Sequence, residues 1–293
     1  MRLADFLRLL SLSAIWGASF LFLRLIAPVL GALPTAFFRT LLASLGLVGI
    51  LLLMRQRFDF KGKTVSLVFL GAITSGLPFF MYGFAAKILP AGYSAILNAT
   101  TPLMGVVIGA LFFSEHLTAS KAAGVLVGLG GVALLTQAGP VAISTSVLLA
   151  IGACLISTAC YGLGGFLARR WITDKGGLDS KLVALGSQAG AAAVLLPVVG
   201  VDWMLQPSIS WGGPLIWIYM AILALICTAL AYILYFRLLA DIGPIRSSTV
   251  TFLIPIFGVL WGALFLDEQF SWAHISGGMV IGLAVWLVLR PAK

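Results

Sequence analysis

The sequence predicts an all-α polytopic membrane protein with ten transmembrane helices, arranged as two inverted five-helix repeats. Composition, the spacing of apolar segments and an internal repeat together predict this fold. Of the 293 residues, 61% are hydrophobic and 9% are charged, whereas a soluble domain carries roughly 25% charged residues. Because so few charges cannot cover a water-exposed surface, we expect lipid to surround most of the chain.

Ten apolar segments follow one another with short connections. Each has about 20 residues, the length that crosses ~30 Å of hydrocarbon at ~1.5 Å per residue. Turn residues separate them, for example Ala138-Gly139-Pro140 and Gly243-Pro244. The expected helices are 6–26, 34–54, 64–86, 92–113, 119–137, 146–168, 180–199, 214–238, 244–265 and 271–290.

The positions of Lys and Arg predict that both termini are cytoplasmic. With a cytoplasmic N-terminus, fifteen of the 18 Lys and Arg residues fall in cytoplasmic segments. Lys87 alone falls in an external loop, and Arg24 and Arg39 fall within spans. This asymmetry is the positive-inside pattern of membrane proteins. It accounts for the net charge of +9 without a nucleic-acid partner.

A repeated phrase connects the two halves of the chain. GVVIGALFFSEHLTASKAAG, residues 105–124, returns as GVLWGALFLDEQFSWAHISG, residues 258–277, with eight of the 20 positions identical. SLSAIWGASFLFLR, residues 11–24, likewise matches ISTACYGLGGFLAR, residues 156–169. The identical glycines of the first pair are expected to allow close helix packing.

These matches divide the chain into two repeats, 1–137 and 146–290, with five helices each. Because five is odd, the second repeat enters the membrane in the opposite orientation. Inverted halves recur in secondary transporters, since two similar halves can exchange conformations and open a central site to either side. The pattern therefore favours a transporter that works by alternating access.

The fourth and ninth spans carry prolines at equivalent places, Pro102 and Pro255. A proline displaces the carbonyl four residues earlier, which here belongs to Asn98 and to Thr251. Freed carbonyls at membrane depth are tolerated where they face protein or a wet cavity, so we expect the substrate to bind here. The alternative is a plain helix kink whose carbonyls are satisfied by nearby Ser and Thr hydroxyls.

Aromatic side chains in the spans are candidates for the cavity wall. Trp and Tyr combine a large apolar face with one polar group, which suits planar metabolites, and planar cations could also stack there. The alternative is anchoring at the membrane interface, where Trp and Tyr are common. Tyr232 and Tyr235 belong to the wider group. The predicted substrate-binding residues are Trp16, Tyr82, Asn98, Tyr161, Thr251 and Trp261.

Two arginines and three prolines form the predicted helix-break and gating set. Charge within a span is costly, but Arg24 and Arg39 lie near external helix ends, where they could snorkel to water. An outer gate or a contact with a substrate carboxylate is the alternative for each, and a structural or gating role is favoured. The set is Pro78, Pro102, Pro255, Arg24 and Arg39.

The sequence also argues against several classes of protein. All nine Asp and Glu residues fall in loops or at helix ends, whereas proton relays and cation-coupled pumps usually need a carboxylate in mid-membrane. We therefore expect gradient-driven movement of a neutral or zwitterionic substrate. No phosphate-cradling loop, metal-spaced histidines or nucleophile with its base is present. The sequence thus predicts no catalytic residues, metal or cofactor, while a passive channel stays open as an alternative.

Four segments carry a family resemblance: AIWGASFLFLR, AFFR at 36–39, ILPAGYSAILNATTPLMGVVIGALFFSE and its echo IGPIRSSTVTFLIPIFGVLWGALFLDE. They resemble the EamA-type branch of the drug/metabolite transporter superfamily, and within it the chain looks most like the YddG group of bacterial aromatic amino-acid exporters. The resemblance implies two tandem EamA repeats in the bacterial inner membrane.

The resemblance also implies a function and partners. It implies export of small amphipathic metabolites, aromatic or other hydrophobic amino acids first. A multidrug or organic-cation exporter of the same fold, for example for planar dications, is the alternative. The implied partners are a small-molecule substrate and membrane lipid, with the chain acting as a monomer or a homodimer.

Overall fold

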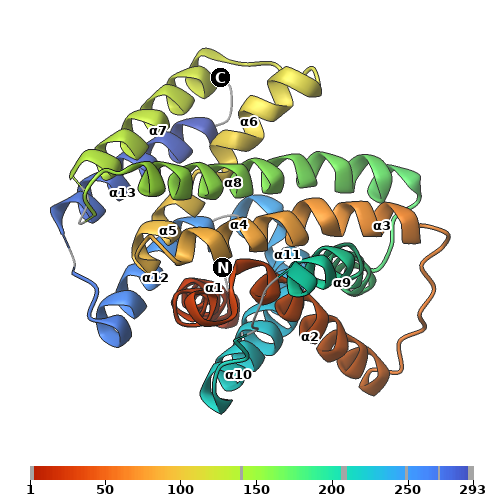
Figure 1. The fold of residues 1–293 in the computed structure, drawn as a ribbon. Coiled ribbons are helices and arrows are strands. Elements are labelled where there is room, and N and C mark those ends of the chain that lie inside the picture. Colours follow the sequence, from red (N-terminus) through yellow and green to blue (C-terminus); the bar gives the residue numbers. More distant parts are fainter. Residues whose placement is uncertain (1–2, 139–140, 206–209, 248–249, 270, 290–293) are drawn as a thin grey trace.

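The computed structural model describes residues 3–138, 141–205, 210–247, 250–269 and 271–289. Every regular element within these ranges is a helix (Figure 1). Eight helical stretches are long and apolar enough to cross a membrane by length and composition. Two shorter apolar helices, Val250–Leu266 and Trp272–Val288, follow them. The prediction of an all-α chain with helices of membrane-spanning length is confirmed.

The first half contains five helical rods, two of which are interrupted. Gly31, with φ 89°, makes the tight turn between the first two rods, a backbone conformation that glycine adopts readily. The elements are α1 (Leu3–Leu30), α2 (Ala32–Leu53), α3 (Thr64–Gly71), η1 (Ala72–Gly76), α4 (Leu77–Ala86), α5 (Ala91–Asn98), α6 (Thr101–Phe112) and α7 (Ala119–Ala138).

The second half is also built of helical rods. Gly243-Pro244 was expected to be a connection but lies inside a helix that continues to Ser247, which is possible because neighbouring groups can make up for the N–H that proline lacks. The elements are α8 (Thr145–Trp171), η2 (Thr173–Lys175), α9 (Ser180–Leu205), α10 (Pro214–Ala221), η3 (Ile222–Leu230), α11 (Ala231–Ser247), α12 (Val250–Leu266) and α13 (Trp272–Leu289).

A π-helical segment interrupts the corresponding rod of each half. The segment η1 joins α3 to α4, and η3 joins α10 to α11. Pro78 follows η1 closely and occupies the first turn of α4, where its missing N–H does no harm. In η3 the Thr228 hydroxyl donates to the carbonyl of Leu223, five residues earlier, at 2.9 Å. Single π segments inside α-helices are rare and often mark functional sites.

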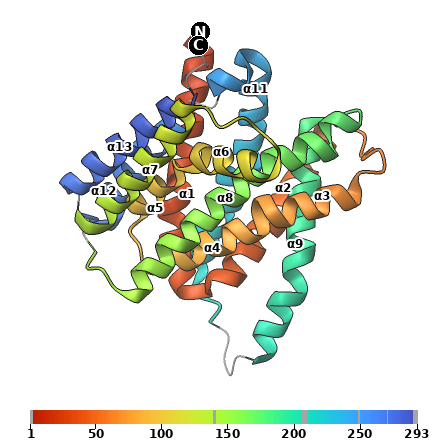
Figure 2. The same cartoon turned by 90° about the horizontal axis from the view of Figure 1, so that it is seen from above.

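Helices of one half pack mainly on helices of the other (Figures 1 and 2). α1 packs on α12, α6 on α8, α2 on α9, and α7 on α13. In two of these contacts, glycines allow the helix backbones to approach closely. A Cβ atom on Gly17 of α1 would lie 2.9 Å from the Gly258 backbone N of α12, and one on Gly162 of α8 would lie 2.8 Å from the Gly105 backbone N of α6.

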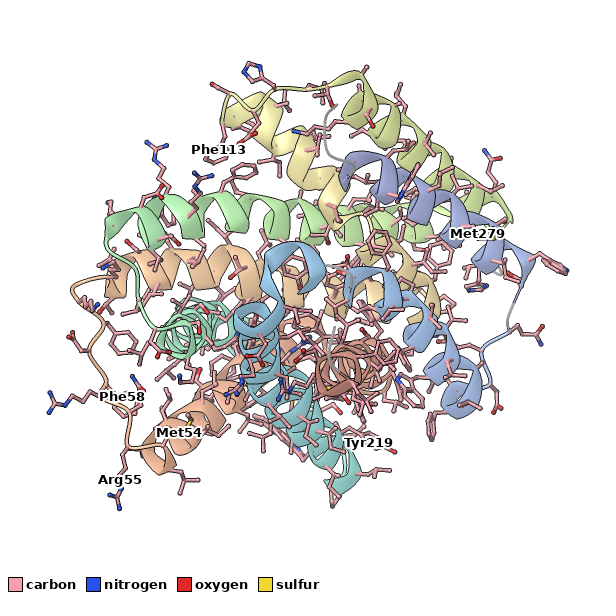
Figure 3. The ribbon with its side chains drawn as sticks, turned by 180° about the vertical axis from the view of Figure 1, so that it is seen from behind. Met54, Arg55, Phe58, Phe113, Tyr219 and Met279 are labelled. Atoms are coloured by element: carbon pink, nitrogen blue, oxygen red, sulfur yellow. The ribbon has the colours of Figure 1, made fainter. Side chains whose placement is uncertain are left out.

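The outer surface of the bundle is apolar, as lipid contact requires. Leu126 of α7 and Met279 of α13 are each 70% exposed. Figure 3 shows Met279 pointing away from the bundle, while Arg55 and Phe58 project from the loop between α2 and α3. Exposed apolar patches of this extent are unusual on a soluble monomer. The arrangement fits a helical bundle surrounded by hydrocarbon.

Candidate functional site

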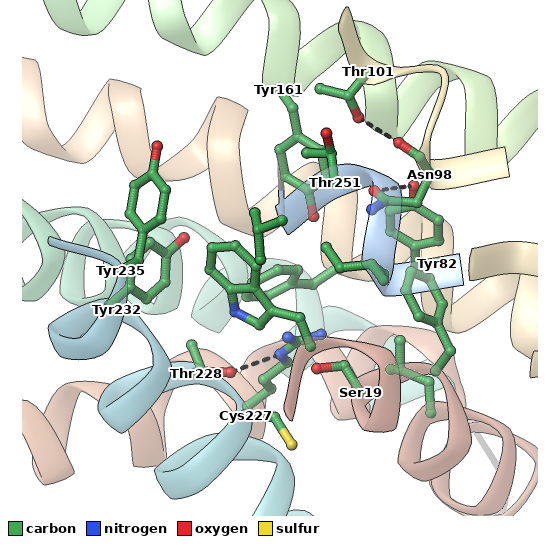
Figure 4. A pocket seen from close by; sticks show the side chains of 17 residues that line it. Ser19, Tyr82, Asn98, Thr101, Tyr161, Cys227, Thr228, Tyr232, Tyr235 and Thr251 are labelled. Atoms are coloured by element: carbon green, nitrogen blue, oxygen red, sulfur yellow. Dashed lines mark hydrogen bonds between the residues drawn. The ribbon is translucent and has the colours of Figure 1, made fainter. Parts of the chain in front are cut away.

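A cavity of about 340 Å³ lies between the two halves (Figure 4). Its walls come from α1, α2, α4, α5, α6, α8, η3, α11 and α12. The aromatic residues that line it are Trp16, Phe20, Phe79, Tyr82, Tyr161, Tyr232 and Tyr235. The lining residues that carry polar groups or sulfur are Ser19, Arg39, Asn98, Thr101, Cys227, Thr228 and Thr251. Its volume lies within the range of small-molecule pockets, roughly 300–1,000 Å³.

Arg39 is buried in this wall, with 6% of its surface exposed. Its Nε donates to the Thr228 Oγ1 atom at 3.0 Å (Figure 4), and its guanidinium carbon lies 3.7 Å from the centre of the Phe79 ring. Because the Thr228 proton is donated to the Leu223 carbonyl, the π segment η3 orients the oxygen that holds Arg39. The expectation that Arg39 could snorkel outward is wrong, because α2 begins at Ala32 and its second turn faces the cavity.

Tyr82 and Asn98 form a second polar pair in the cavity wall. The Tyr82 hydroxyl donates to the Asn98 Oδ1 atom at 2.9 Å, and both residues line the cavity. α5 ends at Asn98, and α6 starts at Thr101 with Pro102 in its first turn. The Asn98 carbonyl accepts the Thr101 hydroxyl at 2.8 Å. The carbonyl freed by Pro102 is therefore satisfied locally, as the kink alternative expected, while the Asn98 side chain faces the cavity.

Aromatic residues from both halves of the chain lie against one another in the cavity wall. The Trp16 ring centre lies 5.4 Å from that of Tyr235. Tyr161, which corresponds to Trp16 in the other half, stacks with Tyr82 at 6.3 Å and 25°. Phe20 meets Tyr82 edge to face at 5.3 Å. A planar ring entering this cavity would therefore meet aromatic faces from both halves.

Five of the six predicted substrate-binding residues line the cavity, and Trp261 does not. The Trp261 Nε1 atom donates to the Ala14 carbonyl at 3.0 Å, and its ring lies against Phe257 and Phe265 at 6.2 and 5.9 Å between ring centres. Trp261 thus joins α12 to α1 outside the cavity, because it lies on a different face of α12 from Thr251.

Pro255 differs from its counterpart Pro102. It lies inside an uninterrupted α12, so the prediction that Pro255 breaks its helix is wrong. Near Pro255, a separate crevice of about 360 Å³ is lined by α5, α12 and α13 residues that include Ile96, Phe252 and His274. A proline can be carried inside a helix with a local adjustment of the hydrogen bonds.

Arg24 and Glu268 lie together at one end of the bundle, beside a second pocket. The Arg24 Nη1 atom donates to the Ala86 carbonyl at the end of α4, at 2.7 Å. The two Glu268 carboxylate oxygens accept the backbone N–H groups of Ala91 at 2.7 Å and of Gly92 at 3.2 Å. A carboxylate at the first turn of a helix stabilises it through hydrogen bonds and through the helix dipole. Glu268 therefore caps α5 across the interface between halves; we name this region the Glu268 end.

The region around Glu115, named the Glu115 end, contains the same turn. Ser114 and Asp267 both have left-handed backbones, with φ 54° and 52°. The Glu115 N–H donates to the Gly109 carbonyl at 3.0 Å, and the Glu268 N–H donates to the Gly262 carbonyl at 3.2 Å. The two glycines leave room for the glutamate that folds back over each of them. The shared turn explains why the segment from glycine to glutamate recurs, as residues 109–115 and 262–268.

Sequence reasoning missed several residues of the cavity wall: Ser19, Phe79, Cys227 and Thr228. Thr228 is a polar residue within the apolar run ILALICTAL, which was a usable signal. The Ser19 hydroxyl lies beside Cys227 (Figure 4). The same part of the chain contains no group of three or more His, Cys, Asp or Glu that could hold a metal ion.

Comparisons with known proteins cover nearly the whole chain. Residues 5–137 and 147–290 both match the EamA-like transporter family. Protein PecM of Dickeya dadantii is 27% identical over 275 residues, which are 94% of this chain and 88% of PecM. The uncharacterized transporter YvbV of Bacillus subtilis is 26% identical over 209 residues, or 70% of this chain and 65% of YvbV. A crystal structure with 18% identity shares the fold at a TM-score of 0.65, over 98% of this chain and 96% of that one.

Proposed function

This chain belongs to the EamA-like transporter family, and from that premise we propose that it is a secondary transporter that exports small amphipathic metabolites, with aromatic and other hydrophobic amino acids as the first candidates. The observation that carries the proposal is the cavity of about 340 Å³ between the halves, with aromatic faces on both sides. A site of this size can enclose a metabolite with one or two rings. We also propose that the chain belongs to the group of aromatic amino-acid exporters within this family.

The proposed architecture has ten spans in two inverted repeats. The two shorter apolar helices, α12 and α13, have 17 and 18 residues, which lies at the lower limit for a membrane span. Two observations support the repeat. The π segments η1 and η3 fall in corresponding rods. The contact of Gly17 with Gly258 corresponds to that of Gly162 with Gly105, as expected when two halves exchange roles about a two-fold axis.

The proposed mechanism is alternating access, with the Glu268 end and the Glu115 end as the two gates. In this structure Glu268 of the second half holds α5 of the first half, whereas Glu115 is exposed. The Lys and Arg distribution puts the Glu268 end outside the cell and both termini in the cytoplasm. The family match and the bacterial relatives support a place in the bacterial inner membrane, with the chain acting as a monomer or a homodimer.

Export of planar organic cations is the second candidate, because aromatic faces also attract cations. Arg39 opposes it, since a buried guanidinium in the cavity wall repels a second positive charge. A passive channel is the third. A carrier saturates with substrate and shows counterflow, whereas a channel shows neither.

Counterflow in liposomes tests the proposal. Purified protein is reconstituted into liposomes loaded with unlabelled tryptophan or phenylalanine, and uptake of the labelled amino acid is followed without a proton gradient. We expect saturable counterflow that falls in Asn98→Ala, because Asn98 lines the cavity. The matched control is Gln137→Ala, which removes an amide at the exposed end of α7 and should transport normally. Correctly folded protein without counterflow of either amino acid would contradict the proposed substrate class.

A further inference from the structure

The cavity between the halves has an unbalanced charge. All nine Asp and Glu residues belong to the part of the chain that the structure describes, and none of them lines the cavity. Arg39 is the charged residue among the side chains that line it. Arginine stays protonated in proteins, so the wall presents one positive charge to whatever enters.

The hydrogen bonds of Arg39 leave its outer edge available. Its Nε is bonded to Thr228 and one face of the guanidinium rests on Phe79, so the group is fixed in orientation. Because the bond to Thr228 uses Nε, it leaves the N–H groups of the two terminal nitrogens unused. A guanidinium held in this way presents parallel N–H donors in the geometry that a carboxylate accepts with both oxygens.

An uncompensated charge at membrane depth is expensive, and such residues usually mark the path of a substrate or ion. Removing a charge from water without a partner costs far more than burying a hydrogen-bonded pair. The apparent cost is reduced when a bound substrate supplies the opposite charge. Arg39 therefore has the burial, fixed orientation and open donors of an anion-binding residue.

The cavity offers less to an ammonium group. The Asn98 Oδ1 atom accepts the Tyr82 hydroxyl and the Thr228 oxygen accepts Arg39, which leaves each of these neutral oxygens one lone pair for a further donor. No lining residue is a carboxylate, which is the usual partner of an ammonium in a buried site. The Arg39 charge also repels a cation placed beside it.

We propose that Arg39 determines substrate specificity by binding a carboxylate, so that the transporter accepts aromatic monocarboxylates and does not require their amino group. The inference rests on the transport function proposed above and narrows its substrate class. An amino acid is accepted because it carries the ring and the carboxylate. An aromatic acid without the amino group is accepted equally well or better. Because such an acid carries one net negative charge, its passage moves charge across the membrane.

Three compounds with the same indole ring separate the possible requirements. Tryptophan has both charged groups, indolepropionate lacks the amino group, and tryptamine lacks the carboxylate. Counterflow of each labelled compound is measured in proteoliposomes and in protein-free liposomes, whose passive uptake is subtracted. We expect indolepropionate to match or exceed tryptophan, and tryptamine to be slower by at least about tenfold, because truncating one partner of a buried charge pair has an effect of at least that size.

The outcomes separate this inference from the proposed function. Counterflow of tryptophan without indolepropionate would overturn the inference and leave the transport function standing. Equal counterflow of tryptamine would overturn it in favour of the cation exporter. Counterflow of none of the three, in folded protein, would overturn both.

Variants of Arg39 test the residue itself through the ratio of two substrates. A loss of folded protein lowers all rates together, so the indolepropionate-to-tryptamine ratio reports specificity. Arg39→Gln should lower that ratio by at least about tenfold. Arg39→Lys keeps the charge and loses the planar pair of donors, so it should give an intermediate ratio. Arg57→Gln, at an exposed arginine of the loop after α2, is the matched control. An unchanged ratio in both Arg39 variants would overturn the assignment.

An imposed membrane potential tests the movement of charge. Potassium outside the liposomes with valinomycin makes the interior positive, and an anion then accumulates. We expect tenfold accumulation of indolepropionate at about 59 mV, the value for one charge, and no accumulation of tryptophan. Indolepropionate uptake that ignores the potential would contradict transport of the anion.

Discussion

The Glu115 end and the Glu268 end have the same turn but different contacts. Gly109 and Gly262 each accept the N–H of the following glutamate, and Ser114 and Asp267 share a left-handed backbone. Yet Glu268 caps α5, while Glu115 is exposed. The turn is local and follows from the repeated phrase. The cap is tertiary and depends on where the other half of the molecule lies.

The sequence contains a further difference between the two ends. The residues that correspond to Ala91 and Gly92 in the second half are Pro244 and Ile245. Proline has no backbone N–H, so Glu115 could find at most one of the two donors that Glu268 uses. The two ends are therefore unequal, with the stronger cap at the Glu268 end. Four changes to the sequence test this difference in stability.

The largest effect is expected from Gly262→Ala. Its added Cβ would collide with the Glu268 carboxylate, which cannot move without losing its bonds to α5. Overpacking of this kind destabilises by about 1–3 kcal/mol, and we expect a lower thermal unfolding temperature in detergent. Gly109→Ala is the matched control, because its Cβ meets the movable Phe166 ring at 2.8 Å and Glu115 Cγ at 3.2 Å. A larger loss in Gly109→Ala would contradict the comparison.

Glu268→Ala should have the next largest effect. It removes both acceptors from the first turn of α5, and loss of a helix cap costs about 0.5–2 kcal/mol. Glu115→Ala removes an exposed side chain and should stay within roughly 0.5 kcal/mol of the parent chain. Thermal unfolding of both variants measures the difference. Equal losses of stability in Glu268→Ala and Glu115→Ala would show that the cap on α5 contributes nothing to the stability of the protein.

Ala91→Pro should have a smaller effect and makes the Glu268 end resemble its counterpart. Proline suits the first position of a helix, and Pro90 before it already has the extended backbone that a following proline needs. The change removes the N–H that donates to Glu268 Oε1. Removing one of the two bonds should cost less than the about 0.5–2 kcal/mol of losing the whole cap, and about 0.4–1 kcal/mol is regained from a stiffer unfolded chain. Ala91→Gly, which keeps the N–H, is the control; greater stability of Ala91→Pro than of the parent chain would count against the cap.

The smallest effect on stability is expected from substitutions in the two left-handed turns, and it should be equal at both ends. Ser114→Gly and Asp267→Gly relieve a left-handed backbone, which costs roughly 1–2 kcal/mol for other residues, and add back the conformational freedom of glycine. We expect each variant to be stabilised by less than about 1 kcal/mol, by similar amounts. Urea unfolding of the two variants measures this. Opposite signs would mean that the two turns are not equivalent.

Much of the fold could be predicted from the sequence, because apolar segments of membrane length and short connections leave few arrangements. Which face of each helix points toward lipid and which toward another helix could not be predicted. Lipid and helix interfaces are both apolar, so nothing in the sequence of α12 distinguishes the Trp261 face from the Thr251 face. The depth of Arg39 was misjudged because it depends on where α2 begins. The segment η3 contains neither proline nor glycine, so its π geometry, which positions Thr228, arises from tertiary packing.

Opposite movement of the two ends is the most direct test of the central claim. Spin labels at Lys87 and Gln269 report the Glu268 end, and labels at His116 and Arg237 report the Glu115 end; all four residues are exposed. The three native cysteines are first replaced, and distances are measured by pulsed electron paramagnetic resonance with and without indolepropionate. Alternating access predicts that one distance distribution lengthens while the other shortens. Both pairs moving together, or neither moving in protein active in counterflow, would contradict the account.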